Sequence, residues 1–124
     1  MTGKKEITAA EVKEEIKKGL RNFNGATIKG NLYLGGATIE GDLDFRGATI
    51  KGDLNFGRAP IEGNLYLGGA TIEGNLYLGG ATIEGELDFS TKEGPTKIYV
   101  SPEMAERVHF AAPNIPLVME TKPR

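Results

Sequence analysis

The chain contains no cysteine, which excludes disulfide bonds and thiolate metal sites. It also lacks a surplus of charge, because 15 Lys and Arg against 17 Asp and Glu leave a formal net charge of −2. Phosphate-binding proteins usually carry a clustered basic surplus, so we expect no nucleic-acid partner. Long hydrophobic runs are missing as well: residues 1–6 are polar, and no apolar stretch follows them. Neither a signal peptide nor a membrane span is predicted, and we expect a cytoplasmic protein without membrane contact.

Residue types that carry chemistry are also scarce. His109 is the one histidine, and a lone histidine is most often a packing or surface residue. No serine or lysine has a base partner suggested by the sequence. The glycine-rich stretches do not form a phosphate loop, because GATIEG lacks the lysine and the Ser or Thr that follow in such a loop. We therefore expect no catalytic residue, no metal site and no cofactor, and a protein that is not an enzyme.

Glycine, in contrast, is abundant and regularly spaced. Of the 18 glycines, 15 lie between Gly25 and Gly85, and fixed spacing of this kind indicates tandem repeats. Six 11-residue segments align without a gap, beginning at residues 25, 36, 47, 58, 69 and 80. Offset 2 is always alanine, offset 4 isoleucine, offset 6 glycine and offset 8 leucine, and offset 10 is leucine or phenylalanine. The fourth segment is irregular at its start, where it reads Arg58, Ala59 and Pro60.

The four apolar offsets share one parity, which is the periodicity of a β-strand. We expect them to face inward, with Thr, Lys or Glu, Asn or Asp, and Tyr facing outward. Glycine at offset 6 and the residue pair at offsets 11 and 1 would turn the corners. A coil of 11 residues would be too thin for these side chains, since stacked faces need about 10 Å between them. We therefore expect an all-β, right-handed parallel β-helix with three four-sided coils of 22 residues, at 25–46, 47–68 and 69–90.

The ATIxG and xLxFxG halves of each segment resemble the faces of pentapeptide-repeat proteins. That resemblance implies a right-handed quadrilateral β-helix with an apolar residue at the centre of each face. This repeat departs from the family pattern, because it has 11 residues where two faces would have 10. The IxGxL core is also similar to the repeats of bactofilins, which are cytoskeletal β-helices that polymerise end to end. Both resemblances cover residues 25–90 and specify fold better than function.

Different sequences flank the repeats, and we expect one domain with a cap at each end, formed by residues 1–24 and 91–124. Thr8 and Glu11 form a capping box, and Val12, Ile16 and Leu20 share one face of a helix over about residues 9–18. After residue 90 we expect a polar loop, a strand at 97–100, a helix at 102–111 that begins after Ser101, and an extended stretch at 114–121.

Two surfaces are candidates for function. We expect a structural or protein-interaction module that binds a protein or itself, because the C-terminal segment has more apolar side chains than a lid needs. The alternative is a carboxylate-lined face that binds cations or mimics DNA, as some pentapeptide-repeat proteins do toward topoisomerases; a merely solvated face is the simpler interpretation. The candidate interaction surface is Met104, Val108, Phe110, Ile115, Leu117, Val118 and Met119, and the candidate acidic face is Glu40, Asp42, Asp44, Glu62, Glu84, Glu86 and Asp88.

Overall fold

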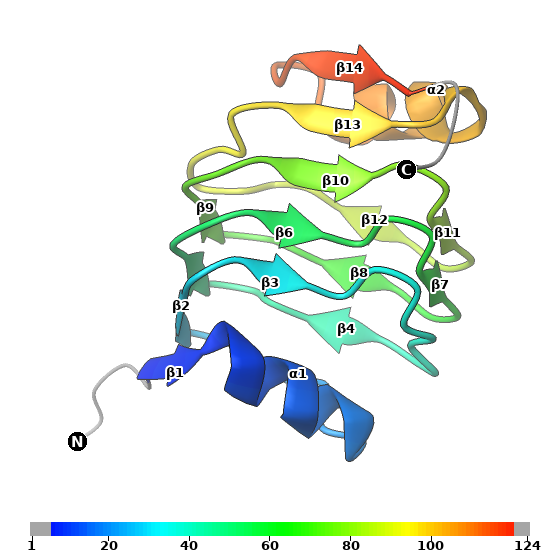
Figure 1. The fold of residues 1–124 in the computed structure, drawn as a ribbon. Coiled ribbons are helices and arrows are strands. Elements are labelled where there is room, and N and C mark those ends of the chain that lie inside the picture. The colour runs from blue at the N-terminus through cyan, green and yellow to red at the C-terminus, as the bar shows by residue number, and fades with distance from the viewer. Residues whose placement is uncertain (1–5, 121–124) are drawn as a thin grey trace.

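A computed structural model describes residues 6–120 and shows a column of short parallel strands with one helix at each end (Figure 1). The strands form four faces. The first face holds β1 (Glu6–Thr8), β2 (Thr27–Lys29), β5 (Thr49–Ile50) and β9 (Thr71–Ile72). The second face holds β3 (Leu32–Tyr33), β6 (Leu54–Asn55), β10 (Leu76–Leu78), β13 (Ile98–Val100) and β14 (Leu117–Met119). The third face holds β7 (Pro60–Ile61) and β11 (Thr82–Ile83), and the fourth holds β4 (Leu43–Asp44), β8 (Leu65–Tyr66) and β12 (Leu87–Asp88).

The strand register gives the number of residues per coil. Ile28 pairs with Ile50, and Ile50 pairs with Ile72, so each residue stacks on the one 22 positions later. The third face keeps the same register, because Ile39 bridges to Ile61 and Ile61 pairs with Ile83. The prediction of two repeats in each four-sided coil is therefore confirmed.

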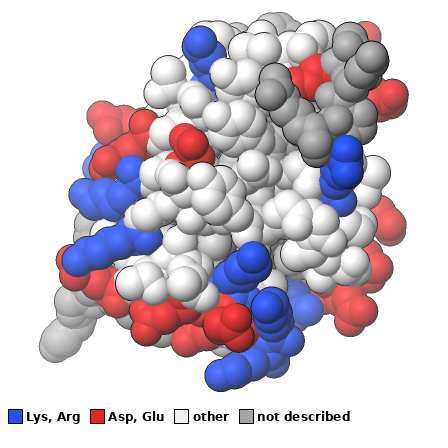
Figure 2. All heavy atoms as spheres, viewed as in Figure 1, with Lys and Arg blue, Asp and Glu red and all other residues white. Residues whose placement is uncertain are grey.

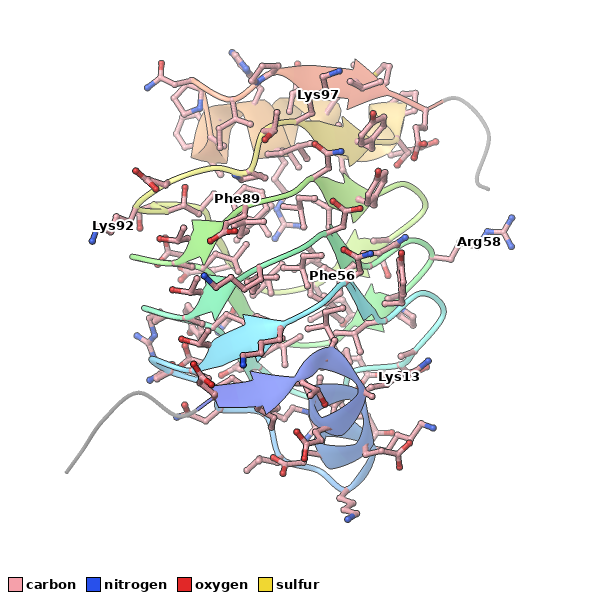
Figure 3. All side chains as sticks on the ribbon, turned by 60° about the vertical axis from the view of Figure 1, so that its left-hand side comes forward. Lys13, Phe56, Arg58, Phe89, Lys92 and Lys97 are labelled. Carbon is pink, nitrogen blue, oxygen red and sulfur yellow. The ribbon has the colours of Figure 1, made fainter. Side chains whose placement is uncertain are left out.

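The interior is filled by the apolar offsets, as their parity predicts. The described residues at offsets 2, 4, 8 and 10 are almost all buried, and Phe45 and Phe56 are 0% exposed. Figure 3 shows Phe56 between the faces. Phe23, just before the first repeat, continues the column by stacking on Phe45 with ring centroids 5.6 Å apart. Burial of each large side chain stabilises the fold by about 1.5–3 kcal/mol, so the stacked interior is the main source of stability.

Glycine is needed at the corners for two different reasons. At offsets 11 and 1 the chain makes a β-turn, closed for example by Ala48 N–H donating to Phe45 O at 3.0 Å. The offset-1 residue of such a turn has positive φ, 72° at Gly47, which only glycine adopts without cost. Arg58 occupies this offset in the fourth repeat with a φ of 61°, the one non-glycine residue of the described chain with positive φ.

At offset 6 the prediction needs correction. Positive φ occurs only at the first two of these corners, Gly30 and Gly41. In the later coils the reason is close stacking: a Cβ on Gly52 would lie 2.9 Å from the carbonyl oxygen of Gly30 and closer still to Oδ1 of Asn31. From Gly52 onward, offset 6 therefore excludes a side chain because the coils touch there, whereas at Gly30 and Gly41 the positive φ favours glycine.

The polar residues at offset 7 face outward, as expected, and four of them also accept a hydrogen bond from the next coil. Asp53 N–H donates to Oδ1 of Asn31 at 2.8 Å, and Asn75 N–H donates to Oδ1 of Asp53 at 2.8 Å. Asp42 and Asn64 continue the same arrangement on the opposite side of the rod, at 2.8 Å. These short side chains form a ladder of hydrogen bonds between coils, which explains why Asn and Asp recur at this offset.

The N-terminal cap consists of β1 and helix α1 (Ala9–Lys17). The predicted capping box between Thr8 and Glu11 is present, and the predicted helix is one residue shorter at its end. Val12 and Ile16 are buried against the first coil, whereas Leu20 is 44% exposed. The expectation that Leu20 shares the buried face is wrong, because α1 has ended and the chain turns at Gly19, where φ is 101°.

At the C-terminal end, β13, helix α2 (Pro102–Ala111) and β14 follow the predicted order. The segment between the repeats and β13 is more regular than its composition suggests, because Thr71 bridges to Glu93 and Ile98 pairs with Leu76, both in the 22-residue register. Residues 91–101 are thus a degenerate seventh repeat that adds half a coil. β14 then pairs in parallel with β13 at the edge of the second face.

Candidate functional site

The C-terminal end of the column is closed mainly by α2. Met104 and Val108 point into the core and are 7% and 0% exposed. Arg107 donates from one guanidinium nitrogen to the carbonyl oxygen of Ile83 at 2.5 Å and from the other to that of Gly85. Since no described strand pairs with β11 on its C-terminal side, these bonds satisfy carbonyl groups that the next coil would otherwise have satisfied. Arg107 therefore covers the third face at this end.

Only some residues of the predicted interaction surface are exposed. Met104 and Val108 do not belong to it, because the amphipathic helix turns them into the core of the same chain. Phe110, 88% exposed, lines a shallow hollow with Tyr66 on the fourth face. Met119, 53% exposed, lies on β14 in the opposite, second face. The half-buried members of the set also lie in the C-terminal segment: Ile115, Leu117 and Val118.

The outer edge of β14 has no partner strand among the described residues. On its inner side, Ile98 N–H donates to Pro116 O at 2.9 Å and Glu120 N–H donates to Val100 O at 2.8 Å. Hydrogen-bonding groups alternate along a parallel strand, so the N–H and C=O groups of Leu117 and Met119 point away from β13. The second face thus ends in an open edge with apolar side chains.

The acidic face is less uniform than the sequence predicts. Glu40, Glu62 and Glu84 do form an exposed column, one per coil, on the third face. Asp42 lies next to this column, but its Oδ1 accepts a hydrogen bond from Asn64 N–H at 2.8 Å. The corresponding oxygen of Asp88 accepts from Ser90 N–H at 3.0 Å, and the remaining member, Glu86, is exposed.

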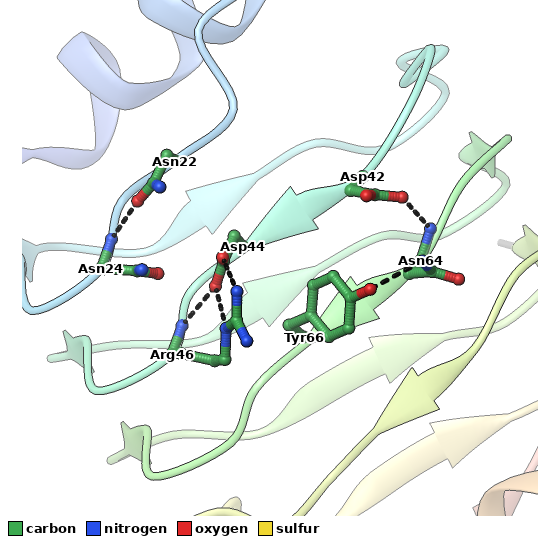
Figure 4. A network of polar contacts seen from close by, with 7 residues as sticks. All are labelled: Asn22, Asn24, Asp42, Asp44, Arg46, Asn64 and Tyr66. Carbon is green, nitrogen blue, oxygen red and sulfur yellow. Dashed lines mark hydrogen bonds and ion pairs between the residues drawn. The ribbon is translucent and has the colours of Figure 1, made fainter.

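Asp44 does not contribute to a solvated acidic face, and this prediction is corrected. It is 8% exposed, and Arg46 donates from Nε to Oδ1 at 3.0 Å and from a terminal nitrogen to Oδ2 at 2.6 Å (Figure 4). These bonds, which outweigh the opposing effect of burial, hold the pKa of Asp44 below its usual range. The guanidinium also lies 4.6 Å from the centre of the Tyr66 ring. The ion pair of Asp44 and Arg46 therefore interrupts the candidate acidic face.

Sequence reasoning missed a groove on the second face. Tyr77 and Tyr99 stack with ring centroids 4.6 Å apart, because Tyr99 occupies offset 9 of the degenerate seventh repeat. Extending the 22-residue register beyond residue 90 would have revealed this contact. The face seen in Figure 2 is mostly uncharged at its centre. The groove has a volume of about 520 Å³ and is lined by Gly35, Gly36, Asn55, Gly57, Arg58, Tyr77, Gly79, Tyr99 and Glu120.

The structure offers no metal-binding cluster within residues 6–120, where no three His, Asp or Glu side chains converge. His109 lies exposed on α2. Neither helix of the described range is long and apolar enough to cross a membrane.

Comparison with known proteins identifies the repeats. Residues 23–71 match the family model described as pentapeptide repeats, a segment of 49 residues in a chain of 124. Together with the parallel strands and four faces, this match shows that the repeat region folds as a right-handed β-helix similar to those of pentapeptide-repeat proteins. The similarity to bactofilins has no support in these comparisons. None of the curated proteins and none of the solved structures matches the chain.

Proposed function

We propose that the protein is a non-catalytic β-helix that acts as a structural or protein-interaction module and associates with itself through β14. The match to pentapeptide repeats supports the general part of this proposal, because it identifies a repeat scaffold. The repeats also run without insertion, so no long loop builds a cleft over any face of the column. The open edge of β14 is the observation that supports self-association.

An exposed strand edge is normally protected by charge, proline or a covering element. Pro116 and Glu120 flank β14, but the strand itself is Leu-Val-Met. Met119 is 53% exposed although it aligns with buried Val100 of β13. The edge therefore combines unpaired backbone groups with apolar side chains, which another strand could cover.

A second copy of the chain fits this edge by symmetry. Homo-oligomers are most often twofold, and a twofold axis beside Val118 would pair two β14 strands in antiparallel orientation. Leu117 of one copy would then lie opposite Met119 of the other. Residues placed this way exchange two N–H···O bonds, so the outward-pointing N–H and C=O groups of both residues in each strand would be hydrogen-bonded.

The alternative function, binding through a carboxylate-lined face, is less well supported. Asp44 is paired with Arg46, and Asp42 binds the backbone of the next coil. The Glu40, Glu62 and Glu84 column remains as a row of single carboxylates on a flat face, which is the usual form of a solvated surface.

Light scattering of the purified chain tests the proposal. We expect a mass of twice 13.3 kDa at high micromolar concentration. Met119→Lys should return the protein to a monomer, because a charge at the edge opposes pairing. Phe110→Ser is the matched control, since Phe110 is equally apolar but lies on the opposite face, and it should leave the dimer intact.

A wild-type chain that stays monomeric would refute self-association. A dimer lost with Phe110→Ser and kept with Met119→Lys would place the contact on the fourth face and contradict the role of β14. These point substitutions test the role of β14 more specifically than deletion of the residues after Thr96 would. That deletion would also remove β13 and α2, including the buried Val100 and Val108.

A further inference from the structure

The N-terminal end of the column presents four strand edges, and three of them are covered. On the first face, β1 pairs with β2. On the second face, α1 packs against β3. On the fourth face, Asp44 N–H donates to Arg21 O at 3.0 Å, and Phe23 N–H donates to Asp44 O at 2.8 Å. The third face differs, because no described strand lies beneath it.

The uncovered edge is formed by Thr38, Ile39 and Glu40. Ile39 uses both of its backbone groups toward the next coil: its N–H donates to Pro60 O at 2.9 Å, and its C=O accepts from Glu62 N–H at 2.9 Å. The alternation along a parallel strand then points the backbone groups of Thr38 and Glu40 toward the N-terminal end. No described residue accepts a hydrogen bond from either N–H, and both residues are exposed.

The coils above show how these groups are normally satisfied. Two coils higher in the same column, Thr82 N–H donates to Ala59 O at 3.1 Å and Glu84 N–H donates to Ile61 O at 2.9 Å. Thr38 and Glu40 occupy the same offsets but have no coil below them. The edge therefore retains donors and acceptors at the spacing of a β-ladder.

A pocket of about 400 Å³ lies between this edge and α1. Its floor is apolar, formed by Ile16 and Leu34, both of which are buried. Its rim is basic, and Lys13 projects from α1 (Figure 3). The full lining is Lys13, Ile16, Lys17, Arg21, Leu34, Ala37, Thr38 and Glu40, so three cations face one carboxylate.

Of the three cations of this pocket, only Lys17 has an ion-pair partner among the described residues. Arg21 donates from a terminal nitrogen to Gly19 O at 2.9 Å, but its Nε is buried without an acceptor. A buried donor without a partner is unusual in native proteins and requires an explanation. Lys17 is 3.5 Å from Glu14, and both side chains are more than 60% exposed, so solvent weakens this pair.

We propose that the open edge and this pocket bind an extended, acidic peptide segment of a partner protein as an added strand. Addition of a strand to a free edge is a general mode of peptide recognition, in which backbone bonds give affinity and pockets give specificity. The carbonyl groups of the peptide accept from the N–H groups of Thr38 and Glu40. Its acidic side chains meet Lys13, Lys17 and Arg21, which favour carboxylates over basic side chains.

Fluorescence anisotropy with a labelled peptide of alternating glutamate and valine tests this inference. The peptide in which lysine replaces glutamate is the charge control and should bind at least about tenfold more weakly, as expected for reversing several exposed charges. In NMR spectra of the protein, the amide signals of Thr38 and Glu40 should shift on titration with the acidic peptide.

Thr38→Pro is a variant that the fold already tolerates, because Pro60 occupies the same position one coil higher. It removes one edge N–H and no core atom. We expect the acidic peptide to bind about fivefold more weakly, the effect of one lost hydrogen bond, with an unchanged unfolding midpoint. Arg21→Gln should weaken binding to a similar extent, whereas Lys92→Gln, on an exposed lysine outside the pocket, should not.

Equal affinity of Thr38→Pro and the wild type would overturn the inference, as would equal binding of the lysine peptide. If free glutarate competes as strongly as the peptide, the pocket is a simple anion site and strand addition is wrong. The pocket lies at the opposite end from β14, so peptide binding and self-association are measured independently.

Discussion

Substitution of Gly52 tests the close stacking of coils at offset 6. Gly52 has no positive φ, so alanine meets no conformational penalty there. Its Cβ, however, would lie 2.9 Å from the oxygen and 3.0 Å from the carbon of the Gly30 carbonyl. Both distances are below the usual range for such contacts. The coils would have to separate where Asp53 N–H donates to Asn31 Oδ1 at 2.8 Å.

The expected loss follows from these contacts. Forcing an extra carbon into a closely packed site costs about 1–3 kcal/mol. Weakening the hydrogen bond between Asp53 and Asn31 adds about 1 kcal/mol. We therefore expect Gly52→Ala to destabilise the protein by about 3 kcal/mol, which lowers the melting temperature by roughly 10 °C for a domain of this size. Gly52→Val should be worse.

Two controls separate the possible causes in urea and thermal unfolding. At Gly57, also without positive φ, the added Cβ would lie 3.7 Å from the Gly79 backbone oxygen, and its one closer contact, at 3.1 Å, is with the side chain of Asn55. Gly57→Ala should therefore cost less than about 1 kcal/mol. Thr49→Val, on the outward parity, should be nearly neutral. If Gly52→Ala costs no more than these two changes, coil stacking at offset 6 is not the reason for glycine.

Three further outcomes can be measured by unfolding. Arg58→Gly should stabilise by about 0.5–1 kcal/mol, because the positive φ costs a non-glycine residue about 1–2 kcal/mol and glycine loses part of that gain through chain entropy; an equal or lower stability would contradict this. Replacing Glu40, Glu62 and Glu84 by Gln should leave stability equal or slightly higher at low salt; a large rise in melting temperature with calcium in the wild type alone would instead indicate a cation site. The pKa of Asp44 is lowered in the fold, so its ionised form stabilises the protein fully above the unfolded pKa near 4, and that contribution is lost as pH falls toward the folded pKa. Asp44→Asn should therefore lower stability at pH 7 and reduce the loss of stability as the pH falls below about 4. If stability falls with pH as steeply as in the wild type, the pair with Arg46 does not contribute to it.

The coil architecture could be predicted from the sequence because its determinants are local and periodic. The common parity of offsets 2, 4, 8 and 10, repeated six times, distinguishes strand from helix, and the volume of Phe45 and Phe56 requires a coil of 22 residues. The capping box at Thr8 and the serine–proline start of α2 at Ser101 likewise act within a few residues. Such signals do not depend on how distant segments pack.

The candidate site was harder to predict because it depends on which side of an element faces the core. The composition of α2 shows that it has apolar side chains, but only its docking buries Val108 and exposes Phe110. Asp44 has the same side chain as Asp88, yet Arg46 two residues later neutralises it. The edge beside Thr38 is open because α1 runs under the first and second faces instead. No residue type at that edge indicates from the sequence that it lacks a partner strand.

Hydrogen exchange at β14 tests the central claim, self-association through this edge, most directly. Glu120 N–H is bonded to Val100 O within the chain, so its exchange should be slow at every protein concentration. The amides of Leu117 and Met119 should exchange fast at low micromolar protein and become protected at high micromolar protein, when a second strand accepts their hydrogen bonds. If these two amides exchange equally fast at both concentrations, β14 remains an open edge and the proposed association is wrong.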